Sequence, residues 1–138
     1  MTEKKITICG QEIKMLYCAA TENGFERITQ KSTAVFVPTF IKDEKGELVV
    51  TAPPTATTED YLSLAIAAIV AAYSYNDEEP PIDSKKILYE ATPDEVKLLL
   101  NTIIEIRNEW YSIPKIVEET LKKEAEEQKD SAEEPVKN

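Results

Sequence analysis

The sequence contains no histidine, only three glycines and only two cysteines. Without histidine the chain lacks the commonest general base and metal ligand, and Ser/His/Asp and Cys/His nucleophile systems are excluded. Two cysteines alone cannot complete a four-ligand zinc site, and three isolated glycines cannot form a glycine-rich phosphate loop. We therefore expect no catalytic residues, no metal site and no cofactor, and predict that the protein is not an enzyme.

Long apolar runs are also lacking. The most apolar stretch extends from Tyr61 to Tyr73, with Ser63 as its one polar interruption. As a helix these thirteen residues rise only about 20 Å, less than the roughly 30 Å core of a membrane. The opening MTEKKITIC has no apolar region of the kind found in secretory signals. We expect a cytoplasmic protein without a membrane partner, in which Cys9 and Cys18 stay reduced.

Positive charge is scarce, because 16 lysines and arginines stand against 26 acidic residues and give a net charge of −10. Such a chain repels phosphate backbones, so we expect no nucleic-acid partner. Acidic residues are densest from Asp77 to Glu95. This stretch is either a solvated face or a docking site for a basic partner.

Residues 5–18 have the alternation typical of a β-hairpin. A turn at Gly10-Gln11 would place Cys9 opposite Glu12. Apolar residues would then face each other in two pairs on one side of the hairpin: Ile8 with Ile13 and Ile6 with Met15.

The segment between residues 19 and 57 is less regular. We predict a short helix capped by Thr21, with Phe25 and Ile28 turned inward. The segment KDEKGE, which contains Gly46, lies between two apolar runs and indicates a second hairpin. Phe40 to Pro54 is then an insert that either adds function or varies freely.

Helices dominate from residue 58 onward. Thr58 can cap a helix that runs to about Tyr75. This helix is apolar on every side, so it either forms the centre of its own fold or is partly covered by a neighbouring subunit. Asp83 can cap a short helix through Tyr89.

TPDE, at residues 92–95, is a capping box with proline at the first helical position. The helix that follows has an apolar stripe, predicted to be core or a partner groove, and a polar face exposed to water. The stripe consists of Val96, Leu99, Ile103, Ile106 and Trp110, and the polar face of Lys97, Asn101, Glu105 and Asn108.

These patterns predict an α+β fold in which an N-terminal β-hairpin packs on a small helical bundle, with a second hairpin as an insert. We predict that residues 1–121 form a single domain, whose last helix follows Pro114. Residues 122–138 are mostly charged and are predicted to be a disordered, flexible tail. The candidate protein-interaction residues are apolar side chains of the two long helices: Leu62, Ile66, Ile69, Tyr73 and Trp110.

Four segments in this order resemble the tail assembly chaperones of long-tailed bacteriophages and prophages. KKITICGQEIKMLYC is similar to that family's hairpin "I-x-I-x-G-x-E-Y-x-L", and ATENGFERITQKS to its first helix, which ends in "I-T-G-K-S". TTEDYLSLAIAAIVAAYSY and TPDEVKLLLNTIIEIRNEW are similar to its later helices. Gln30 stands where the family often has glycine, and the segment from Phe40 to Pro54 is longer than usual.

The resemblance implies a small α+β protein that binds the long helical tape measure protein in the bacterial cytoplasm before the tail tube forms around it. It also implies no catalysis, and many family members have a longer product made by frameshifting. The surplus apolar helix surface leads us to expect self-association. Two alternatives remain: an acidic inhibitor or DNA-imitating decoy of a host protein, and a structural tail completion protein.

Overall fold

The computed structural model describes residues 2–112. They form two antiparallel hairpins and four α-helices, which confirms the predicted α+β class. Their order is β1 (Thr2–Ile8), β2 (Gln11–Tyr17), α1 (Ala19–Thr29), the 3-10 helix η1 (Thr33–Phe36), β3 (Thr39–Lys42), β4 (Leu48–Ala52), α2 (Thr58–Ser74), α3 (Ser84–Glu90) and α4 (Pro93–Trp110). The predicted helix after Pro114 and the predicted tail lie outside the described residues.

The β1–β2 hairpin forms where expected, but its register differs from the prediction. Ile6 lies opposite Ile13 and Ile8 opposite Gln11, so the predicted pairing of Ile8 with Ile13 and of Ile6 with Met15 is wrong. Each partner has moved by two residues, and a shift of two leaves every side chain on its original face. All four apolar side chains are therefore still buried on one face.

The hairpin turn is the cause of the altered register. Cys9 and Gly10, not Gly10 and Gln11, occupy its centre, and both have positive φ, 52° and 77°. Positive φ at both central residues defines a type I′ turn, whose twist matches that of the flanking strands. Cys9 therefore adopts a left-handed backbone conformation, which is unfavourable for a residue other than glycine, and the favoured turn type compensates for this cost.

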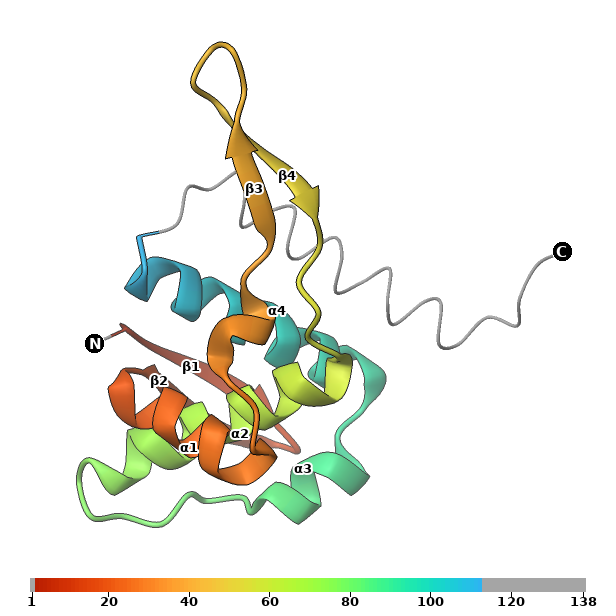
Figure 1. Cartoon of the computed structure of the whole chain (residues 1–138). Coiled ribbons are helices and arrows are strands. Elements are labelled where there is room, and N and C mark those ends of the chain that lie inside the picture. The colour runs from red at the N-terminus through yellow and green to blue at the C-terminus, as the bar shows by residue number, and fades with distance from the viewer. Residues whose placement is uncertain (1, 113–138) are drawn as a thin grey trace, which may run out of the picture.

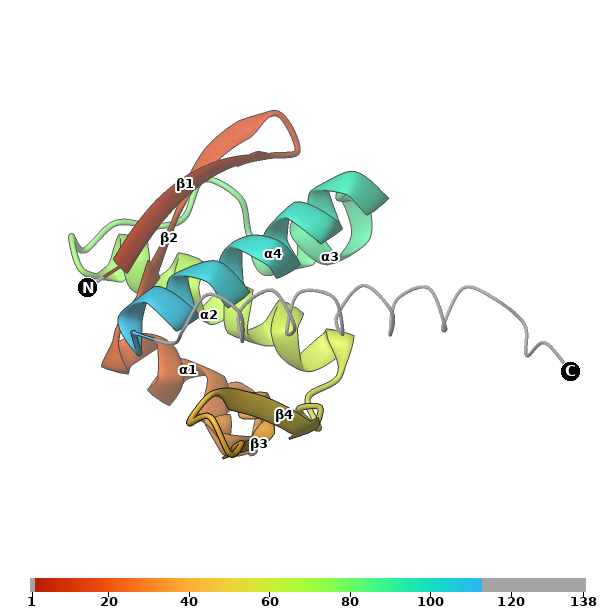
Figure 2. The same ribbon diagram turned by 90° about the horizontal axis from the view of Figure 1, so that it is seen from above.

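Helix α2 lies at the centre of the described residues, in contact with α1, β2 and α4 (Figures 1 and 2). Its N-cap is Thr57, one residue before the predicted cap. Most of its alanines and large apolar residues are buried, which fits the first of the two predicted roles, a helix central to its own fold.

Helix α1 packs tightly on α2 at Gly24, where an added Cβ would lie 3.4 Å from the Cβ of Ala67. The helix begins earlier than predicted, with Cys18 as N-cap and Thr21 in the first turn. Phe25 is buried as expected, but Ile28 is 58% exposed, so its predicted inward position is wrong. Gln30 caps the C-terminal end of α1, and its φ of 59° is a left-handed value that usually favours glycine or asparagine.

Helices α3 and α4 begin at the predicted caps, Asp83 and Thr92. In α4 the capping box is complete, and Glu95 Oε2 also accepts a 2.6 Å hydrogen bond from the backbone N–H of Cys9. The start of α4 is thereby joined to the first hairpin turn. The predicted position of Asn108 on the wet face is wrong, because packing covers a wider arc of α4 than the apolar stripe, and Asn108 is fully buried.

The predicted second hairpin is present as β3 and β4, and we call residues 39–52 the arm. The arm rises from the body on the side opposite α3 and the loop before it (Figure 1). Its base is anchored by the buried Pro38 and Pro54 and by a 2.9 Å hydrogen bond from the Ala56 N–H to the Val35 carbonyl. Among residues 2–112, no helix has the length and apolar character needed to cross a membrane.

Candidate functional site

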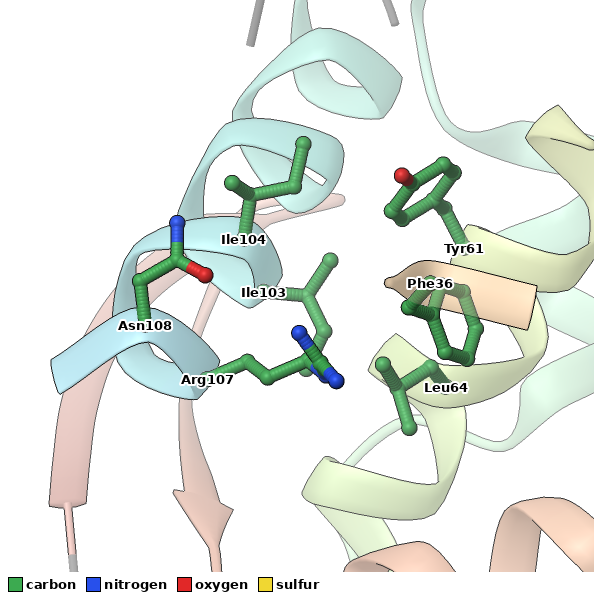
Figure 3. A pocket seen from close by; sticks show the side chains of 7 residues that line it. All are labelled: Phe36, Tyr61, Leu64, Ile103, Ile104, Arg107 and Asn108. Carbon is green, nitrogen blue, oxygen red and sulfur yellow. The ribbon is translucent and has the colours of Figure 1, made fainter. Parts of the chain in front are cut away.

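A small internal pocket lies between α4, α2 and η1. It is lined by Phe36, Tyr61, Leu64, Ile103, Ile104, Arg107 and Asn108. Figure 3 shows the Arg107 side chain extending from α4 toward Phe36 and Leu64. The guanidinium carbon lies 5.7 Å from the centre of the Phe36 ring and 4.7 Å from that of Tyr111, so two aromatic faces hold the charge.

Three polar atoms at this pocket have no hydrogen-bond partner among the described residues: Nε of Arg107 and both side-chain polar atoms of Asn108. Buried polar atoms of this kind are costly unless they are hydrogen-bonded, often by water. The pocket volume of about 10 Å³ is no larger than one water molecule requires. It is therefore a packing feature of the core and has no room for a substrate.

An aromatic cluster next to this pocket joins α4 to β2. Trp110 lies between Tyr17 and Tyr111, with ring centres 5.4 Å and 4.8 Å away. Both tyrosine hydroxyls donate to the same oxygen of Glu22. Burial raises the pKa of Tyr17, and burial together with the hydrogen bond to Glu22 raises the pKa of Tyr111 to about 12. At neutral pH both phenols therefore stay protonated and act as hydrogen-bond donors, which suits a structural role.

The surface formed by α1, α2 and α3 is hollowed on either side of Val70. One hollow, of about 300 Å³, lies between α1 and α2 and is lined by Ala20, Asn23, Gly24, Arg27, Ile28, Ala67, Val70, Ala71 and Ser74. The other, of about 290 Å³, reaches α3 and is lined by Ile28, Ile66, Ile69, Val70, Glu79, Pro80, Ile82, Asp83, Ser84 and Ile87. We call the two hollows together the groove.

Ile28 and Val70 border both hollows and are its most exposed large apolar side chains, at 58% and 49%. Neither residue is among the interaction residues predicted from the sequence. A signal for Val70 was present, because Ser63 and Ser74 are the two serines of this helix and, at 100° per residue, lie on the same face as Val70. The two serines mark the side of α2 on which Val70 is exposed.

The predicted interaction residues are divided between surface and core. Leu62 and Ile66 are half-buried on α2, and Ile66 lines the groove. Ile69 and Tyr73 are buried, and the Tyr73 hydroxyl accepts a 3.1 Å hydrogen bond from the backbone N–H of Lys14. Ile69 lines the groove together with Ile66, whereas Leu62 and Tyr73 line neither hollow and Trp110 belongs to the aromatic cluster.

Charged residues stand at the rim of the groove. Arg27 lines the hollow between α1 and α2, whereas Glu79 and Asp83 line the hollow beside α3. The groove therefore combines an apolar centre with a positive rim on one side and a negative rim on the other. Such an arrangement suits an amphipathic segment better than a small polar molecule.

Within residues 2–112, no three side chains of the ligand types His, Cys, Asp and Glu come together as a metal site. Comparison with protein-family models, with curated proteins and with solved structures gave no match.

Proposed function

We propose that this chain is a protein-binding protein of the bacterial cytoplasm, without catalysis, and that it acts as a tail assembly chaperone for the tape measure protein of a long-tailed phage or prophage. The observation that carries the proposal is the groove, whose exposed Ile28 and Val70 offer an apolar docking surface on the helical body. A long helical protein can place apolar side chains three and four residues apart into such hollows.

A detail of α1 supports the family resemblance on which the partner rests. Gln30 occupies the position at which the family often has glycine. Its left-handed backbone, with φ of 59°, is the conformation for which glycine is the usual choice at a helix end. A family preference for glycine at this position is therefore what the local geometry would produce.

The expected strength of binding follows from the exposed area. Complete burial of a valine or isoleucine side chain contributes about 1.5–3 kcal/mol, so covering the exposed half of Val70 contributes about 1 kcal/mol. Val70→Glu would lose that contribution and would also place a charge against an apolar partner. We expect the dissociation constant to rise at least tenfold, which corresponds to about 1.4 kcal/mol.

The test is a titration of the purified chain with the tape measure protein encoded beside it, in about 0.1 M and about 1 M salt. Binding through apolar contacts should persist at high salt, because only the screened electrostatic part is lost. Leu98→Glu is the matched control, since Leu98 is 41% exposed on α4 and does not line the groove. It should bind as the unmodified chain does, whereas Val70→Glu should not.

The same titration separates the alternatives. A DNA-imitating decoy would bind a basic DNA-binding protein in low salt only and would ignore the tape measure protein. A tail completion protein would remain in finished tails, where immunoblotting of purified phage detects it. Either result would favour that alternative over the chaperone proposal. Equal binding of the tape measure protein by Val70→Glu and Leu98→Glu would contradict the proposed role of the groove.

A further inference from the structure

Arg107 is a buried cation without a carboxylate partner among the described residues. It is 5% exposed and takes part in neither of the two ion pairs within residues 2–112. The rings of Phe36 and Tyr111 attract its charge, but the Nε–H has no hydrogen-bond acceptor in this part of the chain. Because burying a charged group is costly unless its hydrogen bonds are made, the guanidinium needs an acceptor that the described residues do not supply.

Asn108, the next residue of α4, has the same deficit. It is 1% exposed, and neither its Oδ1 nor its Nδ2 is hydrogen-bonded within the described residues. A side-chain amide has an acceptor oxygen and N–H donors, and buried amides normally use both. Since Arg107 and Asn108 line the same pocket, donors and an acceptor without partners come together at one place.

The pocket has the size and the lining that a single water molecule needs. Its volume is about 10 Å³. A cavity of about 10–15 Å³ is enough for one water, which also needs two to four polar partners. Figure 3 shows the Asn108 oxygen turned toward the side of α4 on which Ile103 and Arg107 lie. The other lining side chains are mostly apolar, so a bound molecule would find its polar contacts mainly at Arg107 and Asn108.

We propose that one water molecule is bound in this pocket as part of the native structure, where it bridges the side chains of Arg107 and Asn108. The water accepts hydrogen bonds from the Arg107 Nε–H and from an Asn108 Nδ2–H, and it donates one to Asn108 Oδ1. A side-chain amide presents its oxygen and one N–H on the same side, so a single water reaches both. The resulting total of about three hydrogen bonds is usual for buried water.

A small anion such as chloride is the other ligand that a buried cation could attract. The donors of Arg107 and Asn108 would suit an anion, but the Asn108 oxygen would repel it. A chloride ion is also larger than a water molecule, and the pocket volume is at the lower limit even for water. The mixture of donors and an acceptor therefore favours water.

The bound water lies near the root of the arm. Phe36 is the last residue of η1, and the chain passes from it through Val37 and Pro38 into β3. By fixing the guanidinium of Arg107 against the Phe36 ring, the water joins α4 to the segment that leads into the arm. We therefore expect this water to exchange slowly with the solvent and its loss to lower Tm.

The direct test is NMR spectroscopy of the isotope-labelled full chain, which detects water protons close to the Asn108 Nδ2 and Arg107 Nε protons. Nuclear Overhauser spectra in the laboratory and rotating frames distinguish a bound water from proton exchange with the solvent, because the signs of the two effects differ. We expect cross peaks to water at both side chains, with the sign of a long-lived bound water. Absence of these cross peaks at either side chain would overturn the inference.

Two variants of Asn108 and one control locate the site. Asn108→Leu keeps the number of side-chain heavy atoms but has no polar atom, so the water contact of Arg107 should disappear and Tm should fall by roughly 5–10 °C. Asn108→Ser keeps a hydroxyl and leaves more room, so the Arg107 contact should remain. Asn101→Leu is the control, because Asn101 is half-buried on α4 and does not line the pocket, and both water contacts should survive it.

A water contact of Arg107 that persists in Asn108→Leu would contradict the proposed bridge. If Asn108→Leu does not fold, the spectra of the unmodified chain still decide the question, since the bridge requires cross peaks at both side chains.

A comparison of salts separates water from an anion. Tm is measured at constant ionic strength as chloride replaces gluconate, an anion too large for the pocket. A bound water predicts no saturable dependence of Tm on chloride, whereas a saturable rise would assign the site to an anion and overturn the inference. No residue of this pocket lines the groove, so failure of the inference would leave the chaperone proposal standing.

Discussion

Replacing Phe36 with alanine is the most informative test of how the arm is joined to the body. Phe36 is 1% exposed and lies at the end of η1, directly before the segment that leads into β3. Its ring packs against Phe25 and Tyr61, each with a centre-to-centre distance of 4.9 Å. The substitution therefore removes the aromatic contact by which η1 holds α1 and α2 together.

The expected loss of stability can be estimated from these contacts. Substituting alanine for a fully buried phenylalanine costs about 3–5 kcal/mol, because the apolar transfer energy is lost and a cavity remains. Each of the two aromatic pairs is worth about 0.5–1.5 kcal/mol beyond area burial, which places Phe36 toward the middle or upper part of that range. We expect a loss of about 4 kcal/mol in the free energy of unfolding and a fall in Tm of roughly 15 °C.

Urea unfolding followed by circular dichroism measures the change, and Phe40→Ala is the matched control. Phe40 is the same residue type four positions later, but it is 41% exposed on the arm, so its loss should cost only about 1 kcal/mol. If Phe36→Ala leaves the chain unfolded in water, Phe36→Leu should keep it folded at a cost below about 1.5 kcal/mol. Equal losses for Phe36→Ala and Phe40→Ala would refute the reasoning.

Two further predictions concern polar contacts of α2. Burial opposes the ionisation of Asp60, but hydrogen bonds from the Thr57 backbone and Lys31 outweigh it and lower the pKa of Asp60. A lowered folded pKa gives stability that is present above the unfolded value of about 3.9 and is lost as pH falls through the folded value. Asp60→Asn should therefore flatten the decline of urea midpoints on acidification below about pH 4, and an unchanged decline would count against this account. Tyr73→Phe removes the partner of the Lys14 N–H and should cost about 1–2 kcal/mol in urea unfolding, whereas Tyr75→Phe, at an exposed position, should cost nothing measurable.

The elements with strong local signals were predictable from the sequence. The capping box at Thr92 places a hydrogen-bonded start on α4, and Asp83 does the same for α3, because caps depend on residues three positions apart. The turn around Gly46 and the first hairpin were also predicted, because a tight turn and the alternation of its flanking strands depend on residues close together in the sequence. Even the wrong register preserved the buried face, since the period of a strand is two residues.

The candidate site depended on contacts between distant segments, which periodicity does not specify. Ile28 and Val70 become neighbours because Gly24 lets α1 approach α2, and they stay exposed because hollows remain on either side of Val70. In the same way, Asn108 is buried because packing extends beyond the apolar stripe of α4. The sequence alone determined which segments are helices and strands, since those choices depend on neighbouring residues. Only the tertiary structure decided which apolar residues the core covers and which remain available to another molecule, because that choice depends on how the helices and the arm are placed against one another.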